Sequence, residues 1–163
     1  MAYGVKYRLE FTDNELNDKK IEILKDAYTG SVNSIVASNN PCTIEWSSDD
    51  DFYSPIKGSS CTLNLLVTDT VTYDDFYDAD EREYQVKIYY KDSSDVYQLF
   101  WIGYIVVDQF QEAVISEPFP ISLKAFDGLG TLKKYYYPID KTQLNSKTYI
   151  YVIANILKNL NLD

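Results

Sequence analysis

The sequence has 163 residues, of which 45% are hydrophobic and 25% are charged. A chain of this length buries roughly two-thirds of the surface that it exposes when unfolded, which is enough for a core without metal or disulfide staples. Its 25 acidic and 15 basic residues give a formal net charge of −10, and the basic residues are scattered. Because this charge repels nucleic-acid phosphates, we do not expect specific binding to nucleic acid.

Histidine is absent from the sequence, and its absence rules out Ser-His-Asp and Cys-His catalysis and removes the commonest metal ligand. Cys42 and Cys61 are the two cysteines, and neither belongs to a CxxC pair. The N-terminus does not resemble a signal peptide, and no stretch approaches the roughly 18 apolar residues of a membrane helix. We expect reduced thiols, no catalytic residue, no metal, no cofactor and no membrane segment.

Tyrosine is unusually frequent, with 16 copies. Its ring favours β-strands, and its hydroxyl allows one side of the residue to stay wet while the other is buried. The composition therefore indicates a β protein with adhesive faces.

Two segments at the start of the chain predict an antiparallel hairpin. Apolar residues occupy alternate positions in residues 3–12 and again around Ile21 and Ile23 in residues 19–28, which is the period of a half-buried strand. The polar residues 13–18 supply the turn between them.

Residues 31–46 predict two short strands divided by Asn39, Asn40 and Pro41, because this cluster does not continue a ladder. Residues 47–60 then break every periodicity and predict a loop or a crossing between strands.

Two further strands are predicted from Ser60 to Val67 and over residues 84–90, where apolar and polar residues alternate. The acidic and aromatic segment between them is expected to loop out, with its charges forming a solubilising surface.

The most apolar run, residues 96–107, predicts a long strand at the centre of a sheet, bent or bulged at Gly103. A hairpin with arms at 108–115 and 118–125 is expected to follow it. Asp127 then has the character of a cap for a short helical turn over residues 127–134.

The last predicted element is an amphipathic helix over residues 148–160, whose apolar stripe has helical spacing. The whole pattern predicts a mainly β fold, a largely antiparallel barrel or sandwich, over residues 1–145. Residues 146–163 would carry the helix, which would either introduce a second domain of a longer protein or dock back on the sheet as a terminal lid.

Several phrases, in chain order, resemble the N-terminal domain of bacteriophage and prophage tail-tip proteins, the baseplate hubs, especially of the Bacteroidetes type. They are SPIKGSS at 54–60, LFWIGYIVVDQFQEAV at 99–114, PFPISLKAFDGLGTLK at 118–133 and the helix at 149–160. The residues that carry the resemblance, here called the motif residues, are Gly58, Trp101, Gly103, Asp127, Gly128, Leu129 and Leu132.

The resemblance implies a structural subunit of the virion tail that is assembled in the cytoplasm of the host bacterium. Copies of such a domain, commonly three, would join with one another and with other tail proteins into a ring that continues the tail tube. DNA would pass through the ring without specific binding, and no catalysis is implied.

Two rival functions stay open at this point. Exposed aromatic residues, such as those at 135–137 or 52–53, would suit a carbohydrate-binding or adhesion module. Two of the many carboxylates could also flank a glycosidic bond in a hydrolase, although sequence does not show which acids pair. The acidic stretches 49–51 and 74–81 carry oxygen ligands of the kind that calcium takes, but neither has the D-x-D-x-D-G spacing.

Overall fold

The structure is a computed structural model that describes residues 2–47, 58–68, 71, 74–77, 79, 82–106, 118–129, 151 and 154. It divides the chain into two compact units, Met1–Asp127 and Gly128–Asp163. The second unit lies almost wholly outside the described residues, so the predicted boundary at residue 145 stays a prediction.

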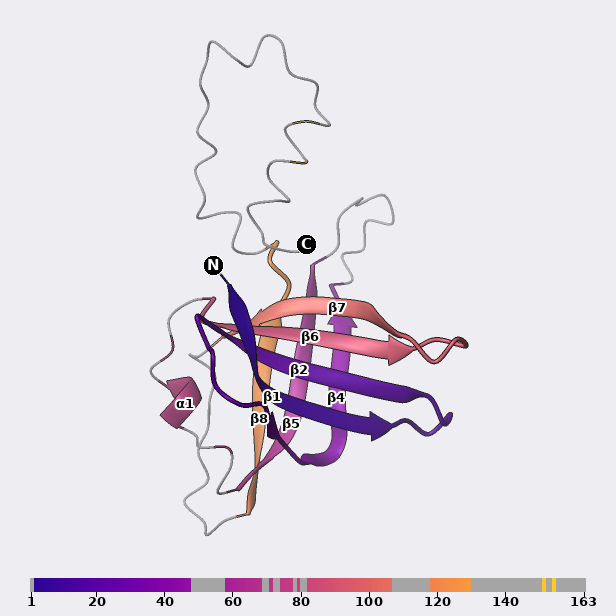
Figure 1. Ribbon diagram of the computed structural model, residues 1–163, viewed down its shortest axis with the longest axis horizontal. Helices are drawn as coiled ribbons and strands as arrows, with labels where there is room; N and C mark the ends of the chain where they lie inside the picture. Colours follow the sequence, from indigo (N-terminus) through magenta and orange to yellow (C-terminus); the bar gives the residue numbers. More distant parts are fainter. Residues whose placement is uncertain are drawn as a thin grey trace. The chain divides into compact units, whose positions relative to one another are not determined.

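The first unit is built mainly of β-strands, which confirms the predicted fold class (Figure 1). Its strands belong to one 8-stranded sheet with the order β3-β1-β2-β6-β7-β8-β5-β4. All neighbouring pairs are antiparallel except β1 and β3. The elements are β1 (Tyr3–Thr12), β2 (Asp18–Asp26), β3 (Asn33–Ser34), β4 (Ala37–Trp46), β5 (Ser59–Val67), α1 (Asp74–Tyr77), β6 (Tyr84–Lys91), β7 (Tyr97–Ile105) and β8 (Phe119–Phe126).

The strands β3 and β4 stand at opposite ends of the sheet order, yet only Ile35 and Val36 lie between them in the sequence. The sheet must therefore curl to bring its two ends together. Ile35 donates its amide to the Arg8 carbonyl in β1 at 2.9 Å, and the Leu66 amide in β5 donates to the Val36 carbonyl at 3.0 Å. The same short link thus bonds to strands far apart in the sheet order. It closes this end of the sheet into a barrel-like body.

The core lies between two layers of this curled sheet. Strands β1, β2, β6 and β7 form one layer, and β4, β5 and β8 run across it (Figure 1). Both layers direct apolar side chains towards the core, as expected from the alternation of apolar and polar residues along the strands. Side chains that are essentially inaccessible to solvent include Tyr7, Ile21, Ile23, Leu63, Leu65, Tyr84, Val86 and Leu123.

The predicted first hairpin is confirmed, with β1 and β2 paired from Tyr3 and Asp26 to Thr12 and Asp18. Its turn has the same backbone pattern as the turn between β6 and β7. In the first, the Asp13 carboxylate accepts the amides of Glu15 and Asn17. In the second, the Asp92 carboxylate accepts two amides in the same relative positions. Hydrogen bonds lower the pKa of both carboxyl groups. The Asn17 backbone amide is the largest cause at Asp13, and the Gln98 side-chain amide, which donates to Asp92 at 2.9 Å, is the largest cause at Asp92.

The expectation of two short strands within residues 31–46 needs correction. After the two-residue β3, a single strand, β4, continues through Asn39, Asn40 and Pro41. The ladder with β5 is nevertheless interrupted there, since Ala37 pairs with Leu65 and the next pair is Cys42 with Leu63. Asn40 adopts a φ of 57°, which asparagine tolerates better than most residues. The cluster therefore makes a bulge in a strand instead of ending it.

The bulge expected at Gly103 lies instead at Phe100. Ile88 of β6 pairs with Trp101, but its neighbour Tyr89 pairs with Leu99, so Phe100 is the extra residue. Leu99 and Trp101 would share one face of a regular strand. The bulge turns Trp101 into the core while Leu99 stays on the outer face, and Trp101 and Leu99 are accordingly buried and exposed. The central position predicted for this strand is confirmed, because β7 lies between β6 and β8.

The acidic segment between β5 and β6 is not simply a solvated loop, which corrects the sequence-based expectation. Phe76 of α1 is buried, with its ring 5.9 Å from that of Tyr7 and 5.0 Å from that of Tyr84. Asp75 accepts a hydrogen bond from the Tyr7 hydroxyl and pairs with the Lys6 ammonium at 2.7 Å. An aromatic anchor with charged neighbours therefore holds α1 against β1.

Several sequence-based predictions fall on residues outside the described ranges. They are the arm at 108–115, the acidic stretch 49–51, the aromatic runs 52–53 and 135–137, and most of the turn at 127–134. Within the predicted helix at 148–160, Tyr151 and Ala154 are helical, and the other residues are likewise outside the description.

Gly103 and Gly58 provide a matched test of packing. A Cβ at Gly103 would collide with the Trp101 indole and lie 2.6 Å from the Phe126 carbonyl oxygen, whereas at Gly58 the nearest described atom is Ser47 Oγ at 3.8 Å. We expect Gly103→Ala to lower the free energy of unfolding by about 1–3 kcal/mol. Gly58→Ala should stay within about 0.5 kcal/mol of the parent. Urea unfolding followed by tryptophan fluorescence measures both, and equal effects would contradict the packing argument.

Candidate protein-interaction site

Four of the motif residues come together at one place in the fold. The Trp101 indole Nε1 donates to Ser59 Oγ at 2.9 Å, and that hydroxyl donates to the Asp127 carboxylate at 2.8 Å. Asp127 also accepts the Ser59 backbone amide, and its own amide donates to the Ser59 carbonyl at 3.0 Å. Gly103 lies beneath the same indole, and Gly58 precedes Ser59.

This cluster ties the start of β5 to the end of β8 and to the middle of β7. The described contacts of the Asp127 carboxylate go to Ser59, so a capping role for it within 127–134 stays a prediction. Gly128 and Leu129 lie in a turn directly after Asp127, and Leu132 is outside the described residues. The arrangement is one of structural hydrogen bonds, in which each polar group holds a neighbouring strand.

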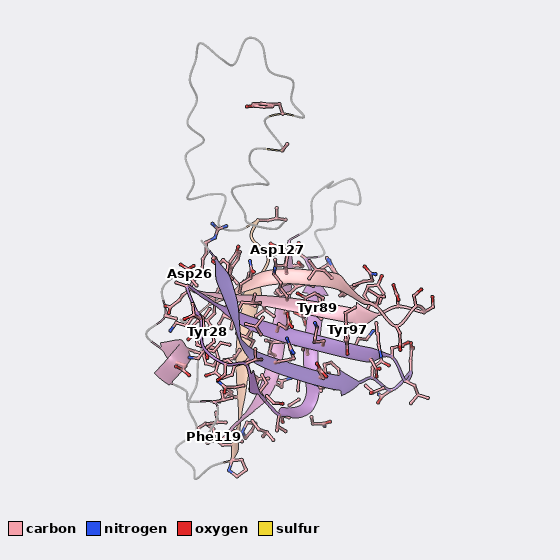
Figure 2. All side chains as sticks on the ribbon, in the orientation of Figure 1. Asp26, Tyr28, Tyr89, Tyr97, Phe119 and Asp127 are labelled. Atoms are coloured by element: carbon pink, nitrogen blue, oxygen red, sulfur yellow. The ribbon has the colours of Figure 1, made fainter. Side chains whose placement is uncertain are left out.

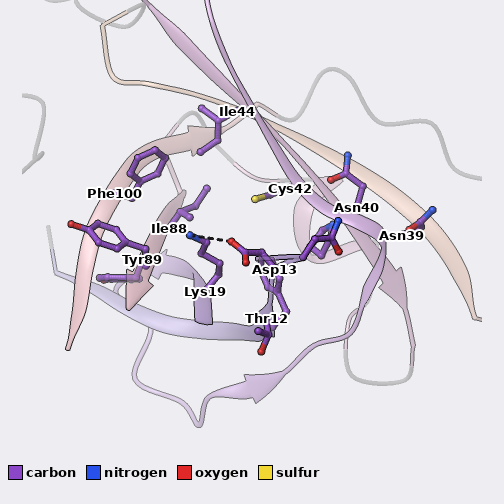
Figure 3. A pocket seen from close by; sticks show the side chains of 14 residues that line it. Thr12, Asp13, Lys19, Asn39, Asn40, Cys42, Ile44, Ile88, Tyr89 and Phe100 are labelled. Carbon is purple, nitrogen blue, oxygen red and sulfur yellow. Dashed lines mark ion pairs between the residues drawn. The ribbon is translucent and has the colours of Figure 1, made fainter. Parts of the chain in front are cut away.

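A groove of about 930 Å³ opens on another part of the first unit, where β4 moves away from β1 (Figure 3). It lies between β4 on one side and the ends of β1, β2, β6 and β7 on the other. Its walls are mostly apolar, with amide side chains at one end. The lining residues are Phe11, Thr12, Asp13, Asn14, Lys19, Asn39, Asn40, Pro41, Cys42, Ile44, Ile88, Tyr89, Tyr90 and Phe100.

The bulge in β4 shapes this groove. Asn40 bonds through its side-chain amide to Thr43 Oγ1 at 3.0 Å, and its carbonyl accepts the Asn64 side chain of β5 at 2.8 Å. These bonds fix the bulged backbone to its own strand and to β5. As a result, β4 follows β5 and leaves a space opposite the layer that contains β1.

A group of exposed aromatic residues lies at the groove, and two of them, Tyr90 and Phe100, belong to its lining. Trp46 and Phe100 are 55% and 54% exposed, and their rings meet edge to face at 6.4 Å. The Tyr90 ring makes a second edge-to-face contact with Phe100 at 6.3 Å. We call Trp46, Tyr90 and Phe100 the aromatic patch.

The charges in the groove are balanced. Asp13 and Lys19 are the charged residues among its lining, and their side chains pair at 3.4 Å (Figure 3). The groove wall therefore carries little net charge, although the whole chain has a formal charge of −10.

The outer face of the same layer is covered by a denser polar network. Glu22 is only 6% exposed, and its carboxylate pairs with Arg8 at 3.0 Å and Lys20 at 3.2 Å. The Lys20 ammonium also lies over the rings of Tyr89 and Tyr97, which are labelled in Figure 2. Burial, followed by the nearby Glu22 carboxylate, raises the pKa of Tyr89 to about 12. The charged groups of this face therefore have partners within the chain.

The two cysteines are free thiols on neighbouring strands. Cys42 lines the groove, and Cys61 is buried in the core. Burial raises the pKa of both thiols, in the case of Cys61 to about 12. Because the thiolate is the nucleophilic form, these groups are poorly suited to attack a substrate.

No three Cys, Asp or Glu side chains gather closely enough to hold a metal ion within the described ranges. In the same part of the chain, none of the helices is long and apolar enough to cross a membrane. Comparison with protein-family models, curated proteins and solved structures gives no significant match to this chain.

The motif residues are evident in the sequence, but the aromatic patch is not. Trp46 and Phe100 are far apart in the sequence, and Leu99, Phe100 and Trp101 form a consecutive apolar run that does not indicate which residue is exposed. The break in alternation within this run was the one available signal, because three adjacent apolar residues in a strand cannot all face the core.

The thiols should react slowly in the native protein. A pKa near 12 leaves about a thousandth of the thiolate that an ordinary cysteine has at the same pH. We therefore expect iodoacetamide at pH 8.5 to modify Cys61 far more slowly in the folded chain than in urea, as followed by peptide mass spectrometry of the Cys42→Ser variant.

The same pKa has a consequence for stability. A raised pKa in the folded state means that Cys61 supports folding below its unfolded pKa of about 9 and loses that support as pH rises towards 12.

Rapid modification of Cys61 by iodoacetamide in the folded chain would contradict the expected protection of this thiol by burial.

Proposed function

We propose that this chain is a structural subunit of a phage tail tip or baseplate hub, which joins further copies of itself into a ring. The observation that carries the proposal is the aromatic patch on a closed β body. Large aromatic residues that stay exposed in a stable domain mark surfaces that contact other proteins. The motif residues resemble those of tail-tip proteins, and four of them, Gly58, Trp101, Gly103 and Asp127, lie together in a cluster that joins β5, β7 and β8.

A ring requires a head-to-tail contact, in which one surface of a subunit meets a different surface of the next. The aromatic patch is suited to be one side of that contact, because Trp46 and Phe100 already pack against each other and lose little side-chain entropy on binding. In this proposal the other tail proteins bind above and below the ring.

The net charge supports passage of DNA and not its retention. Copies that each carry a formal charge of −10 would give an assembly that repels phosphate groups. Such a ring would therefore let DNA through without adhering to it.

Carbohydrate binding is a second candidate, favoured by one specific observation. The amide side chains of Asn39 and Asn40 line the same groove as the rings of Tyr90 and Phe100. Amides that bond hydroxyl groups beside aromatic rings form a common type of small-ligand site. Under this alternative, an oligosaccharide would bind a monomeric chain, and Asn39→Ala would weaken it.

Self-association is the first test of the ring. We expect native mass spectrometry and sedimentation to show multiples of the 18.8 kDa chain as concentration rises. Replacing Trp46 and Phe100 together with serine should raise the dissociation constant at least about tenfold, because aromatic residues dominate interface energies. Circular dichroism should stay unchanged, since both side chains are largely outside the core.

Val32→Ser is the matched control, since Val32 is 45% exposed but lies in the segment before β3. It should associate like the parent chain. A chain that stays monomeric at all concentrations, or loss of association in the Val32 variant alone, would argue against the proposal.

Gene order gives a second and independent test. A tail-hub gene should lie among other tail genes, directly after the gene for the tape-measure protein. Sequencing of the flanking region shows this directly. A neighbourhood of polysaccharide-degradation genes would favour the carbohydrate alternative instead.

A further inference from the structure

Strand β4 has one bonded edge and one open edge. The Ser47 amide donates to the Gly58 carbonyl at 2.8 Å, so these two residues form a hydrogen-bonded pair of the antiparallel ladder. Bonded and non-bonded pairs alternate along such a ladder. Thr43 and Glu45 therefore direct their backbone groups towards β5, and Cys42, Ile44 and Trp46 direct theirs away from it.

The outward backbone groups have no partner in the described part of the chain. Among the described strands, β4 ends the order and pairs with β5, and the described backbone bonds outside the ladders include none to Cys42, Ile44 or Trp46. Proteins usually protect such edges with lysine, proline or a bulge. Here Pro41 and the bulge protect one end, so the open stretch is Cys42 to Trp46.

The open stretch coincides with the groove and the aromatic patch. Cys42 and Ile44 line the groove, and Trp46 belongs to the patch. An extended segment laid along this edge would form backbone bonds with β4 and place every second side chain in the groove. This combination of an open edge and an adjacent apolar groove is the arrangement used in strand addition.

We propose that a second copy of this chain lays an extended segment along the open edge of β4 and so adds a strand to the sheet. This inference rests on the proposed self-association and specifies its chemistry. Because a ring contact joins two different surfaces, the incoming segment is not β4 of the second copy. Trp46 makes the open edge continuous with the aromatic patch.

The groove lining does not oppose a second acidic copy by its own charge. The charged groove residues, Asp13 and Lys19, neutralise each other. At physiological salt, interactions beyond about 8 Å are largely screened, so the local charge matters more than the total.

Amide hydrogen exchange of the 163-residue chain tests the inference without any substitution. At concentrations where the chain associates, the amides of Cys42, Ile44 and Trp46 should exchange at least about tenfold more slowly than in the monomer. The amides of Thr43 and Glu45 are the internal control, because they bond to β5 and should be protected in both states. NMR or fragmentation mass spectrometry resolves neighbouring amides.

A matched pair of variants supplies the second measurement. Ile44→Ala and Ile44→Pro both remove the side chain, but only proline also removes the outward N–H and obstructs an incoming strand. We expect Ile44→Pro to raise the dissociation constant about tenfold over Ile44→Ala. Thermal unfolding of both monomers identifies any difference in folding.

The outcomes separate the two proposals. Strand addition would be overturned if the chain associates while these amides still exchange rapidly and the two Ile44 variants have equal dissociation constants. That result would not contradict the ring itself. A chain that never associates would remove the ring itself. Slowing of the same amides only when a different tail protein is added to a monomeric chain would overturn the second copy as the occupant.

Discussion

Two residues, Ile35 and Val36, carry the chain from the edge of β1 to the edge of β5, and the closed form of the sheet depends on this link. Its backbone bonds to Arg8 and Leu66 join strands that lie far apart in the sheet order. Ile35 is buried in the core cluster, so the link is held by packing as well as by hydrogen bonds. Closure removes the open edge of β1 over this stretch, which is the usual way for a β protein to avoid uncontrolled pairing.

Closure of the sheet is incomplete, and the groove lies where β4 is not joined to the opposite layer. The bulge at Asn39–Pro41 lets β4 continue along β5 while it separates from β1, and the groove occupies the space between them. One local irregularity thus produces both a cavity and an open edge. A second bulge, at Phe100, leaves an aromatic side chain at the solvent side of that cavity. Bulges that redirect side chains are common beside functional sites, and both bulges here serve the same surface.

The cluster of Ser59, Trp101 and Asp127 has a different role. It joins β5, β7 and β8 through bonds that leave each polar group with a partner. Gly103 belongs to it for a steric reason, because the indole and the Phe126 carbonyl fill the space of a side chain. The joint fixes the relative positions of these three strands, and under the proposed self-association a preorganised surface would lose less entropy on binding.

The sequence by itself determined the fold class, the hairpin of β1 and β2, and the strands β5 to β8, because alternation of apolar residues reports directly which positions face a core. It also pointed to Gly58, Trp101, Gly103 and Asp127. Only the tertiary structure decided that these four meet through Ser59, that the bulge in β7 lies at Phe100, and that Phe76 enters the core. It also decided that Trp46 and Phe100 form one patch beside an open edge. These features depend on register and on contacts between distant segments, and a periodic pattern along one strand does not encode either.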